Sequence, residues 1–127
     1  MRGPEKAPQN GGPVLAVVKD LFFVARIRET ARLAGVAVAF AQGAPELATA
    51  LAAPTDLVIV DLTTAERDYD AIFTELERRP SAPPVLGITT HVLARQTQPF
   101  HPRCARVVTR ETLTRELGTI LKEGIAA

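Results

Sequence analysis

Short runs of apolar residues alternate along the chain with longer stretches in which apolar residues recur at helical spacing. The clearest run is residues 57–60, which lies between Asp56 and Asp61 and contains no polar side chain. A strand that is apolar at every position is buried on both faces, as in a parallel sheet. Four more strands are expected over residues 14–18, 36–40, 84–88 and 105–109.

Helices are expected between these strands. Val24, Ile27 and Ala31 share one face of the first helix, and Gly35 is typical of a helix end. Four more helices are expected: one beginning near Pro45, one over residues 69–76, a weak one over residues 91–98 that stops before Pro99, and one over residues 113–121. Strand–helix units with short connections predict a doubly wound α/β fold, a three-layer sandwich with helices on both faces of a parallel sheet.

The composition is that of an ordinary soluble domain. Of the 127 residues, 46% are hydrophobic and 23% are charged, and the length suits one domain with a substantial core. The net charge of +1 favours neither nucleic acid nor membrane as a partner, and no apolar run reaches the roughly 20 residues of a membrane span. A single cysteine excludes an intramolecular disulfide and fits a cytoplasmic location. Residues 1–13 are interpreted as a flexible leader, and residues 14–127 as the domain.

Few residues suggest enzymatic chemistry. No glycine-rich phosphate loop follows the first strand, and no Ser–His–Asp or Cys–His set is apparent, so we expect no enzyme. His91 and His101 lack metal-ligand spacing and are interpreted as surface residues. Cys104 is interpreted as a small core residue. Asp61 is different, because it closes a buried strand at the edge where open α/β sheets bind their ligands.

Several short motifs lie in a recognisable order at the ends of the expected strands. They are residues 17–20 (VVKD), 41–43 (AQG), 56–62 (DLVIVDL), 87–90 (GITT) and 107–110 (VVTR). With these motifs the chain resembles the receiver domain of bacterial two-component response regulators over roughly residues 14–123. The resemblance implies a flavodoxin-like (βα)5 fold with a parallel sheet in the order 2-1-3-4-5.

The resemblance also implies roles for single residues. Asp61 matches the aspartate that accepts a phosphoryl group from a partner histidine. Asp20 matches one acid of a pair that helps to hold Mg²⁺ together with the phosphoacceptor, and Lys19 replaces the other acid. Thr89 matches a hydroxyl that senses the phosphoryl group. Arg110 stands where the family has a lysine that contacts the phosphoryl oxygens.

Several positions depart from the family pattern. Ala65 replaces a common proline, Val107 replaces the aromatic switch residue, and Glu111 replaces the proline after the family's lysine. Lys19 is the most consequential change, because its charge opposes Mg²⁺ in a site where phosphoryl transfer needs the metal. The chain is therefore interpreted as an atypical, degenerate receiver, with Mg²⁺ on Asp20 and Asp61 only if it is a working phosphoacceptor.

The placement of the two basic side chains stays open. Lys19 either pairs with Asp61 in the place of the metal or points outward on its flexible stem. Arg110 either forms a fork toward a phosphoryl group or is solvated beside Glu111, and the solvated arrangement is favoured. Thr89 or its neighbour Thr90 is also suited to cap the following helix.

Two large apolar residues follow Asp20. Leu21 and Phe22 are expected to point away from the core-facing stripe of the first helix, as an exposed contact surface for a protein partner such as a kinase or phosphotransfer protein. The alternative is that the loop after the third strand covers Phe22. A polar face on the last strand and helix offers a homodimer contact.

We therefore expect a stand-alone receiver-like module in signal transduction that acts by protein–protein interaction without phosphorylation and without a cofactor. The alternative is a Mg²⁺-dependent phosphoacceptor, modified on Asp61 in a phosphorelay.

Overall fold

The structure is a computed structural model that describes residues 12–125. Its strands and helices alternate along the chain, except that the 3-10 helix η1 directly follows α4. They are β1 (Val14–Val17), α1 (Leu21–Ala34), β2 (Val38–Phe40), α2 (Ala44–Ala50), β3 (Leu57–Asp61), α3 (Tyr69–Glu77), β4 (Val85–Thr89), α4 (Ala94–Thr97), the 3-10 helix η1 (Gln98–Arg103), β5 (Arg106–Thr109) and α5 (Arg110–Glu123).

The five strands form one parallel sheet in the order β2-β1-β3-β4-β5. β3 lies at the centre and is buried at every position, from Leu57 to Asp61. Its register places Val17 opposite Val60, and Asp61 opposite Ile88 of β4. The continuous apolar runs of the sequence therefore identified the sheet correctly, and the order 2-1-3-4-5 is confirmed.

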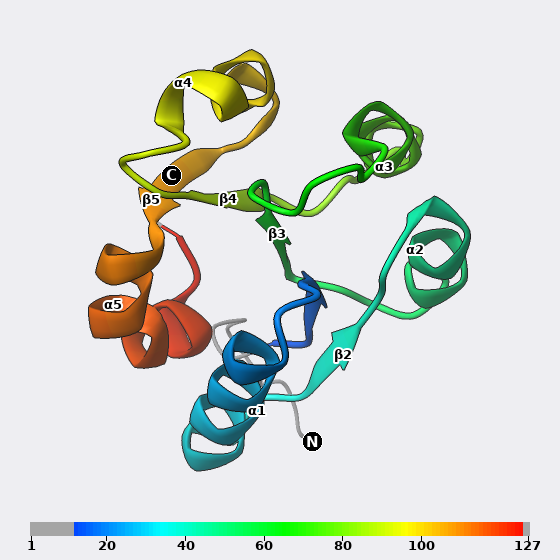
Figure 1. The fold of residues 1–127 in the computed structure, drawn as a ribbon. Helices are drawn as coiled ribbons and strands as arrows, with labels where there is room; N and C mark the ends of the chain where they lie inside the picture. The colour runs from blue at the N-terminus through cyan, green and yellow to red at the C-terminus, as the bar shows by residue number, and fades with distance from the viewer. Residues whose placement is uncertain (1–11, 126–127) are drawn as a thin grey trace.

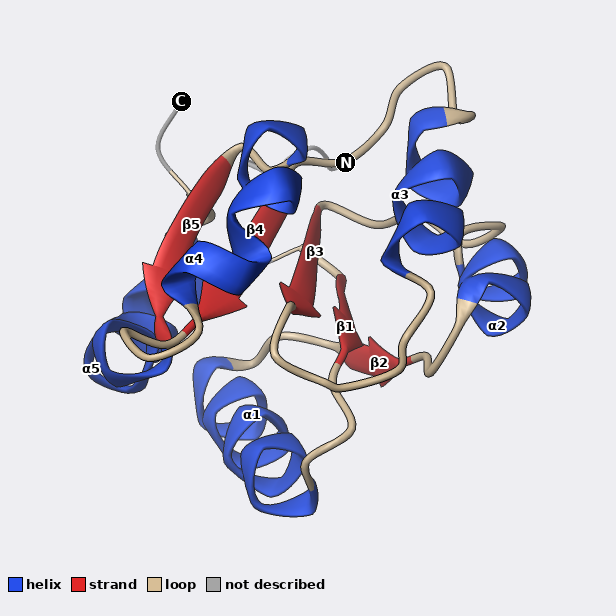
Figure 2. Ribbon diagram, turned by 45° about the horizontal axis from the view of Figure 1, so that its top comes forward, coloured by secondary structure: helices blue, strands red, loops and turns tan. Residues whose placement is uncertain are grey.

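Helices cover both faces of the sheet, which makes the predicted three-layer sandwich. α1 and α5 lie side by side on one face, and α2, α3 and α4 lie on the other (Figures 1 and 2). One core cluster contains Ile27 of α1 and Leu117 of α5, and the other contains Leu47 of α2 and Phe73 of α3. Both faces of β3 are thereby removed from water, as the sequence predicts.

Local sequence explains the bounds of α1. The side chain of Asp20 accepts hydrogen bonds from the amides of Phe22 and Phe23, so it caps the first turn. Gly35 ends the helix with a φ of 72°, in the left-handed region that glycine adopts without steric cost.

The segment between β4 and β5 differs from the prediction. The α-helix is only Ala94–Thr97, and the chain continues as a 3-10 helix through Pro99 and Pro102. A 3-10 helix is tighter and is used in short pieces, and a proline in its first turn removes no hydrogen bond. The two prolines therefore lie inside helical structure, which the sequence-based boundary at Pro99 did not anticipate.

The leader expected over residues 1–13 falls almost entirely outside the described residues. No helix within residues 12–125 combines the length and hydrophobicity that crossing a bilayer requires.

Candidate functional site

Three charged side chains from different elements meet at the carboxyl edge of the sheet. Asp61 ends β3, Asp20 follows β1, and Arg110 begins α5 directly after β5. Parallel strands bring their carboxyl ends to one edge, so residues far apart in the sequence become neighbours there. The structure thus brings together three residues that the sequence singled out.

Asp61 is almost completely buried, with 1% of its surface exposed. Its Oδ1 accepts hydrogen bonds from the backbone amide of Thr63 at 3.0 Å and from the Thr63 hydroxyl at 2.6 Å. Its Oδ2 accepts a hydrogen bond from Nη2 of Arg110 at 2.9 Å. Both carboxylate oxygens therefore have partners within the protein, as a buried charge requires.

Arg110 bridges the two aspartates. While Nη2 donates to Asp61, Nη1 donates to Oδ2 of Asp20 at 3.1 Å, and the guanidinium carbon lies 4.8 Å from the ring centroid of Phe23. A cation at the first position of a helix opposes the helix dipole. The two carboxylates offset this repulsion, so the position of Arg110 depends on both of them.

Asp20 has two tasks at once. Its Oδ1 accepts hydrogen bonds from the backbone amides of Phe22 at 2.9 Å and Phe23 at 3.1 Å. Its Oδ2 accepts a hydrogen bond from Arg110. The hydrogen bond from the Phe23 amide, followed by that from Arg110, lowers the pKa of the Asp20 carboxyl below its ordinary value. Asp20 is therefore ionised at neutral pH and anchors the outer end of the Arg110 bridge.

These contacts correct two sequence-based interpretations. Lys19 is exposed, and none of the ion pairs among the described residues includes it, so the predicted pair between Lys19 and Asp61 is wrong and the outward alternative holds. Arg110 is not a solvated residue beside Glu111, because it bonds both aspartates. The sequence left Lys19 open between a pair with Asp61 and an outward position and favoured a solvated Arg110, whereas the structure places Arg110 among the acids.

The charged residues present do not fit Mg²⁺. The ion prefers oxygen ligands in octahedral geometry, usually with carboxylates. Here a guanidinium lies between Asp20 and Asp61, and residues 12–125 contain no cluster of three His, Cys, Asp or Glu side chains placed to hold a metal ion. Since Arg110 already bonds both aspartates, a dication would have to displace it.

Comparisons with solved structures agree with this architecture. The chemotaxis response regulator CheY4 of Vibrio cholerae is 24% identical, with a TM-score of 0.64 over 86% of this chain and 98% of that one. The receiver domain of a sensor histidine kinase from Pseudomonas aeruginosa is 16% identical, with a TM-score of 0.69 over 86% and 93%. A response regulator from Hahella chejuensis is 15% identical, with a TM-score of 0.71 over 91% and 99%.

The chain has the receiver fold. The sequence itself matches no protein-family model and no curated protein. The likeness in structure therefore confirms the fold that the motifs predicted.

In this receiver fold, the hydroxyl of Thr89 takes part in a chain of hydrogen bonds and does not bond Asp61. Its hydroxyl lies 2.8 Å from the hydroxyl of Thr97 in α4, and that hydroxyl lies 2.8 Å from Nε2 of His101. Thr90, not Thr89, caps the next turn by accepting the amide of Leu93 at 3.1 Å. His101 is only partly exposed and joins this chain, so its interpretation as a simple surface residue is wrong.

Val107 lies on β5 against the close packing around Gly87. A Cβ on Gly87 would come within 2.7 Å of Sγ of Cys104 and within 3.4 Å of Cγ2 of Val107. Cys104, Leu62 and Val107 therefore pack closely around Gly87, and position 107 has no aromatic ring to rotate between an inner and an outer position.

The thiol of Cys104 packs against the core, as predicted. Burial raises its pKa from the ordinary 9.0 to about 11. Because the thiolate is the reactive form, we expect iodoacetamide at pH 8 to alkylate the folded protein about 100-fold more slowly than the urea-unfolded chain. Mass spectrometry over time measures both rates, and equal rates would contradict the shielding of Cys104.

Leu21 and Phe22 are exposed, by 80% and 90%. The loop after β3 does not cover Phe22, so the alternative in which Phe22 is buried is wrong. Phe23, next in the chain, is buried, and its ring packs against the guanidinium of Arg110. The first turn of α1 therefore presents two large apolar side chains beside the charged site.

Sequence reasoning missed several residues that shape the loop after β3. The hydroxyl of Tyr69 donates to the carbonyl of Asp61 at 2.7 Å and accepts the amide of Thr64 at 3.0 Å. Arg67 donates to the carbonyl of Val17 at 3.2 Å and to Oε1 of Gln42 at 3.0 Å. No motif signals these contacts, because each depends on how the loop folds back over the ends of β1 and β2.

Proposed function

We propose that this chain is a receiver-like signalling module that acts by contact with another protein, without phosphorylation of Asp61. One observation carries the proposal: the guanidinium of Arg110 bonds both Asp20 and Asp61 and lies where a metal would have to bind. Phosphoryl transfer to a carboxylate relies on a metal ion to neutralise developing charge on the oxygens. In this chain the resident arginine neutralises the acceptor itself.

Other features of the site support the same proposal. The similar receiver domain from Pseudomonas aeruginosa has a magnesium ion coordinated in its active-site cleft. In this chain the hydroxyl of Thr89 is bonded to Thr97, and position 107 carries a valine. A response to phosphorylation would need Thr89 to leave Thr97, and position 107 has no aromatic ring to follow it.

The surface for a partner is the first turn of α1. Leu21 and Phe22 are exposed there, and Phe22 lines a hollow together with Asp20, Arg26 and Arg110. Large exposed apolar side chains rimmed by charge are typical of protein contact sites. A signalling protein such as a kinase or phosphotransfer protein is the partner that this surface suits, in the cytoplasm, while the polar face of β5 and α5 offers a separate homodimer contact.

A second candidate function is that of a Mg²⁺-dependent phosphoacceptor in a phosphorelay. The arrangement of Asp20, Asp61 and Thr89 at one sheet edge favours it. It requires Arg110 to leave both carboxylates, which separates the two candidates experimentally.

The test uses acetyl phosphate and Mg²⁺, with intact mass as the readout. We expect the wild-type mass to stay unchanged, because Arg110 occupies both carboxylates. Asp61→Asn is the matched control, since it keeps the shape of the side chain and removes the acceptor. A stoichiometric increase by one labile phosphoryl group in the wild type, absent from Asp61→Asn, would establish the phosphorelay function instead.

A further inference from the structure

A cleft lies between the loop after β2 and the loop after β3. The cleft has a volume of about 480 Å³ and lies over the carboxyl ends of β1 and β2. This size is in the range of small-molecule sites, and this edge of an α/β sheet is where ligands bind. Neither Asp20, Asp61 nor Arg110 lines it, so its ligand chemistry is separate from the proposed function.

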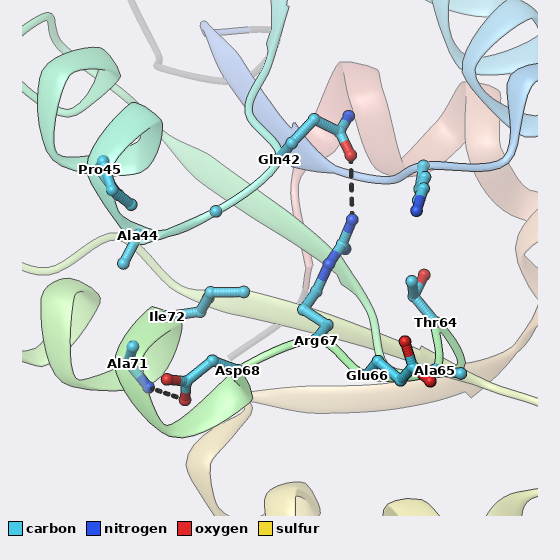
Figure 3. A pocket seen from close by; sticks show the side chains of 12 residues that line it. Gln42, Ala44, Pro45, Thr64, Ala65, Glu66, Arg67, Asp68, Ala71 and Ile72 are labelled. Carbon is cyan, nitrogen blue, oxygen red and sulfur yellow. Dashed lines mark hydrogen bonds between the residues drawn. The ribbon is translucent and has the colours of Figure 1, made fainter.

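Arg67 is fixed at the centre of this cleft. Its Nη2 donates to Oε1 of Gln42 (Figure 3), and its Nη1 donates to the carbonyl of Val17. In turn, Nε2 of Gln42 donates to the carbonyl of Val18 at 2.8 Å. A guanidinium has five N–H donors, so these two bonds leave three for a ligand. The side chain is held in position in advance, which lowers the entropic cost of binding.

Lys19 supplies a second cation to the same cleft. It is exposed, lines the cleft, and makes none of the ion pairs recorded among residues 12–125. A carboxylate placed between Lys19 and Arg67 would receive charge-assisted hydrogen bonds from both. Lys19, for which the metal position was one of two expected placements, therefore lines this cleft instead.

The other residues of the cleft restrict the ligand further. Glu66 and Asp68 also line it, and Asp68 is engaged in capping α3 through the amide of Ala71 at 3.0 Å. Their two negative charges balance Lys19 and Arg67, which disfavours polyanions such as nucleotides. An apolar wall lies opposite, formed by Ala44, Pro45, Ala71 and Ile72 (Figure 3).

The geometry points to this cleft as a binding site for a small monocarboxylate with a compact apolar body. The carboxylate is held by Arg67 and Lys19, and the apolar body lies against Pro45 and Ile72. The ligand carries a single negative charge, because the two acids that also line the cleft repel any further negative charge.

The test is a titration of the full chain with phenylacetate. Binding is measured from the changes in amide chemical shifts in ¹H–¹⁵N NMR spectra. We expect saturable binding, with a Kd on the order of 1 mM or tighter, and shifts centred on Gly43, Ala65 and Arg67. Phenylacetamide, which keeps the body and loses the charge, and citrate, which carries excess charge, should each bind at least about tenfold more weakly.

Variants locate the site. Arg67→Gln should raise the Kd at least about tenfold and Lys19→Gln several-fold, because each removes a charged donor. Arg115→Gln, an exposed arginine on α5, is the matched control and should leave binding unchanged. Circular dichroism checks that Arg67→Gln is folded. Lys19→Gln breaks no ion pair or side-chain hydrogen bond within residues 12–125, so it tests the site independently. Equal binding of phenylacetamide, no saturation, or unchanged binding in Lys19→Gln would overturn the proposal.

The same titration on Arg110→Gln separates this proposal from the preceding one. Phenylacetate should bind this variant as it binds the wild type, because Arg110 does not line the cleft. Loss of binding in an Arg110→Gln variant that circular dichroism shows to be folded would place the carboxylate at the Asp20–Asp61 site, which overturns the cleft assignment and leaves the proposed function to its own test.

Discussion

Replacing Arg110 with glutamine is expected to lower the free energy of unfolding by about 3–5 kcal/mol, the cost of leaving a buried carboxylate without its cation. Asp61 is 1% exposed, and its Oδ2 has Arg110 as its charged partner. Glutamine can keep one hydrogen bond but cannot neutralise the charge. Urea denaturation of the purified variant measures the difference from the wild type.

A matched control comes from the surface of the same protein. Arg106 pairs with Glu116 at 3.2 Å, with both side chains 41% exposed, so Arg106→Gln should cost about 1 kcal/mol at most. If Arg110→Gln costs no more than Arg106→Gln, the bridge does not hold Asp61 in the way argued above.

A double variant separates charge from shape. Asp61→Asn combined with Arg110→Gln should be more stable than Arg110→Gln alone, because asparagine removes the uncompensated charge while filling the same space. Additive losses in the double variant would instead indicate two independent packing effects. The comparison therefore isolates the electrostatic coupling between β3 and α5.

The fold was predictable because its determinants are local and repeated. Residues 57–60 are apolar throughout, and a strand of that kind requires cover on both faces. The stripe of Leu113, Leu117 and Leu121 marks α5 equally plainly, and all three are buried. The segment after β4 was harder, because Pro99 is compatible with a 3-10 helix but not with the interior of an α-helix.

For the site, the sequence predicted which residues take part but not how they contact one another. Asp61 was identified because it ends a buried strand at the edge where α/β sheets bind ligands, whereas Asp20 and Arg110 were identified through the resemblance to receiver domains. Which long basic side chain reaches the acids depends on the position and direction of its Cα–Cβ bond. Arg110 begins α5 and stacks on Phe23, whereas Lys19 faces the neighbouring cleft. Periodicity carries no information on that choice.

Arg67 shows the same limit more clearly. Its partner, the carbonyl of Val17, lies 50 residues away in sequence and is a backbone atom, so no residue type signals the contact. Glu66, just before it, has a φ of 61°, a left-handed conformation that a glutamate adopts only when its surroundings impose it. The cleft arises from this loop geometry and had no counterpart among the sequence motifs.

Removing the arginine should also open the site to a metal. We expect Arg110→Ala to bind Mg²⁺ at least about tenfold more tightly than the wild type, because a unit charge beside a dication costs several kcal/mol even at an effective dielectric of about 20. Isothermal titration calorimetry measures both affinities. Lys19→Asp alone should change little, since Arg110 still bonds Asp20 and Asp61.

The combination of Arg110→Ala with Lys19→Asp should bind Mg²⁺ more tightly than either single variant, because it removes the cation and places a third acid after β1. Bound Mg²⁺ should then restore part of the stability that Arg110→Ala loses, raising its Tm while leaving the wild-type Tm unchanged, since a ligand that binds the folded state stabilises it by mass action. Equal Mg²⁺ affinity in the wild type and in Arg110→Ala would mean that the guanidinium is displaced without cost. The aspartates would then be open to phosphoryl chemistry, and the contact-only function would have to be abandoned.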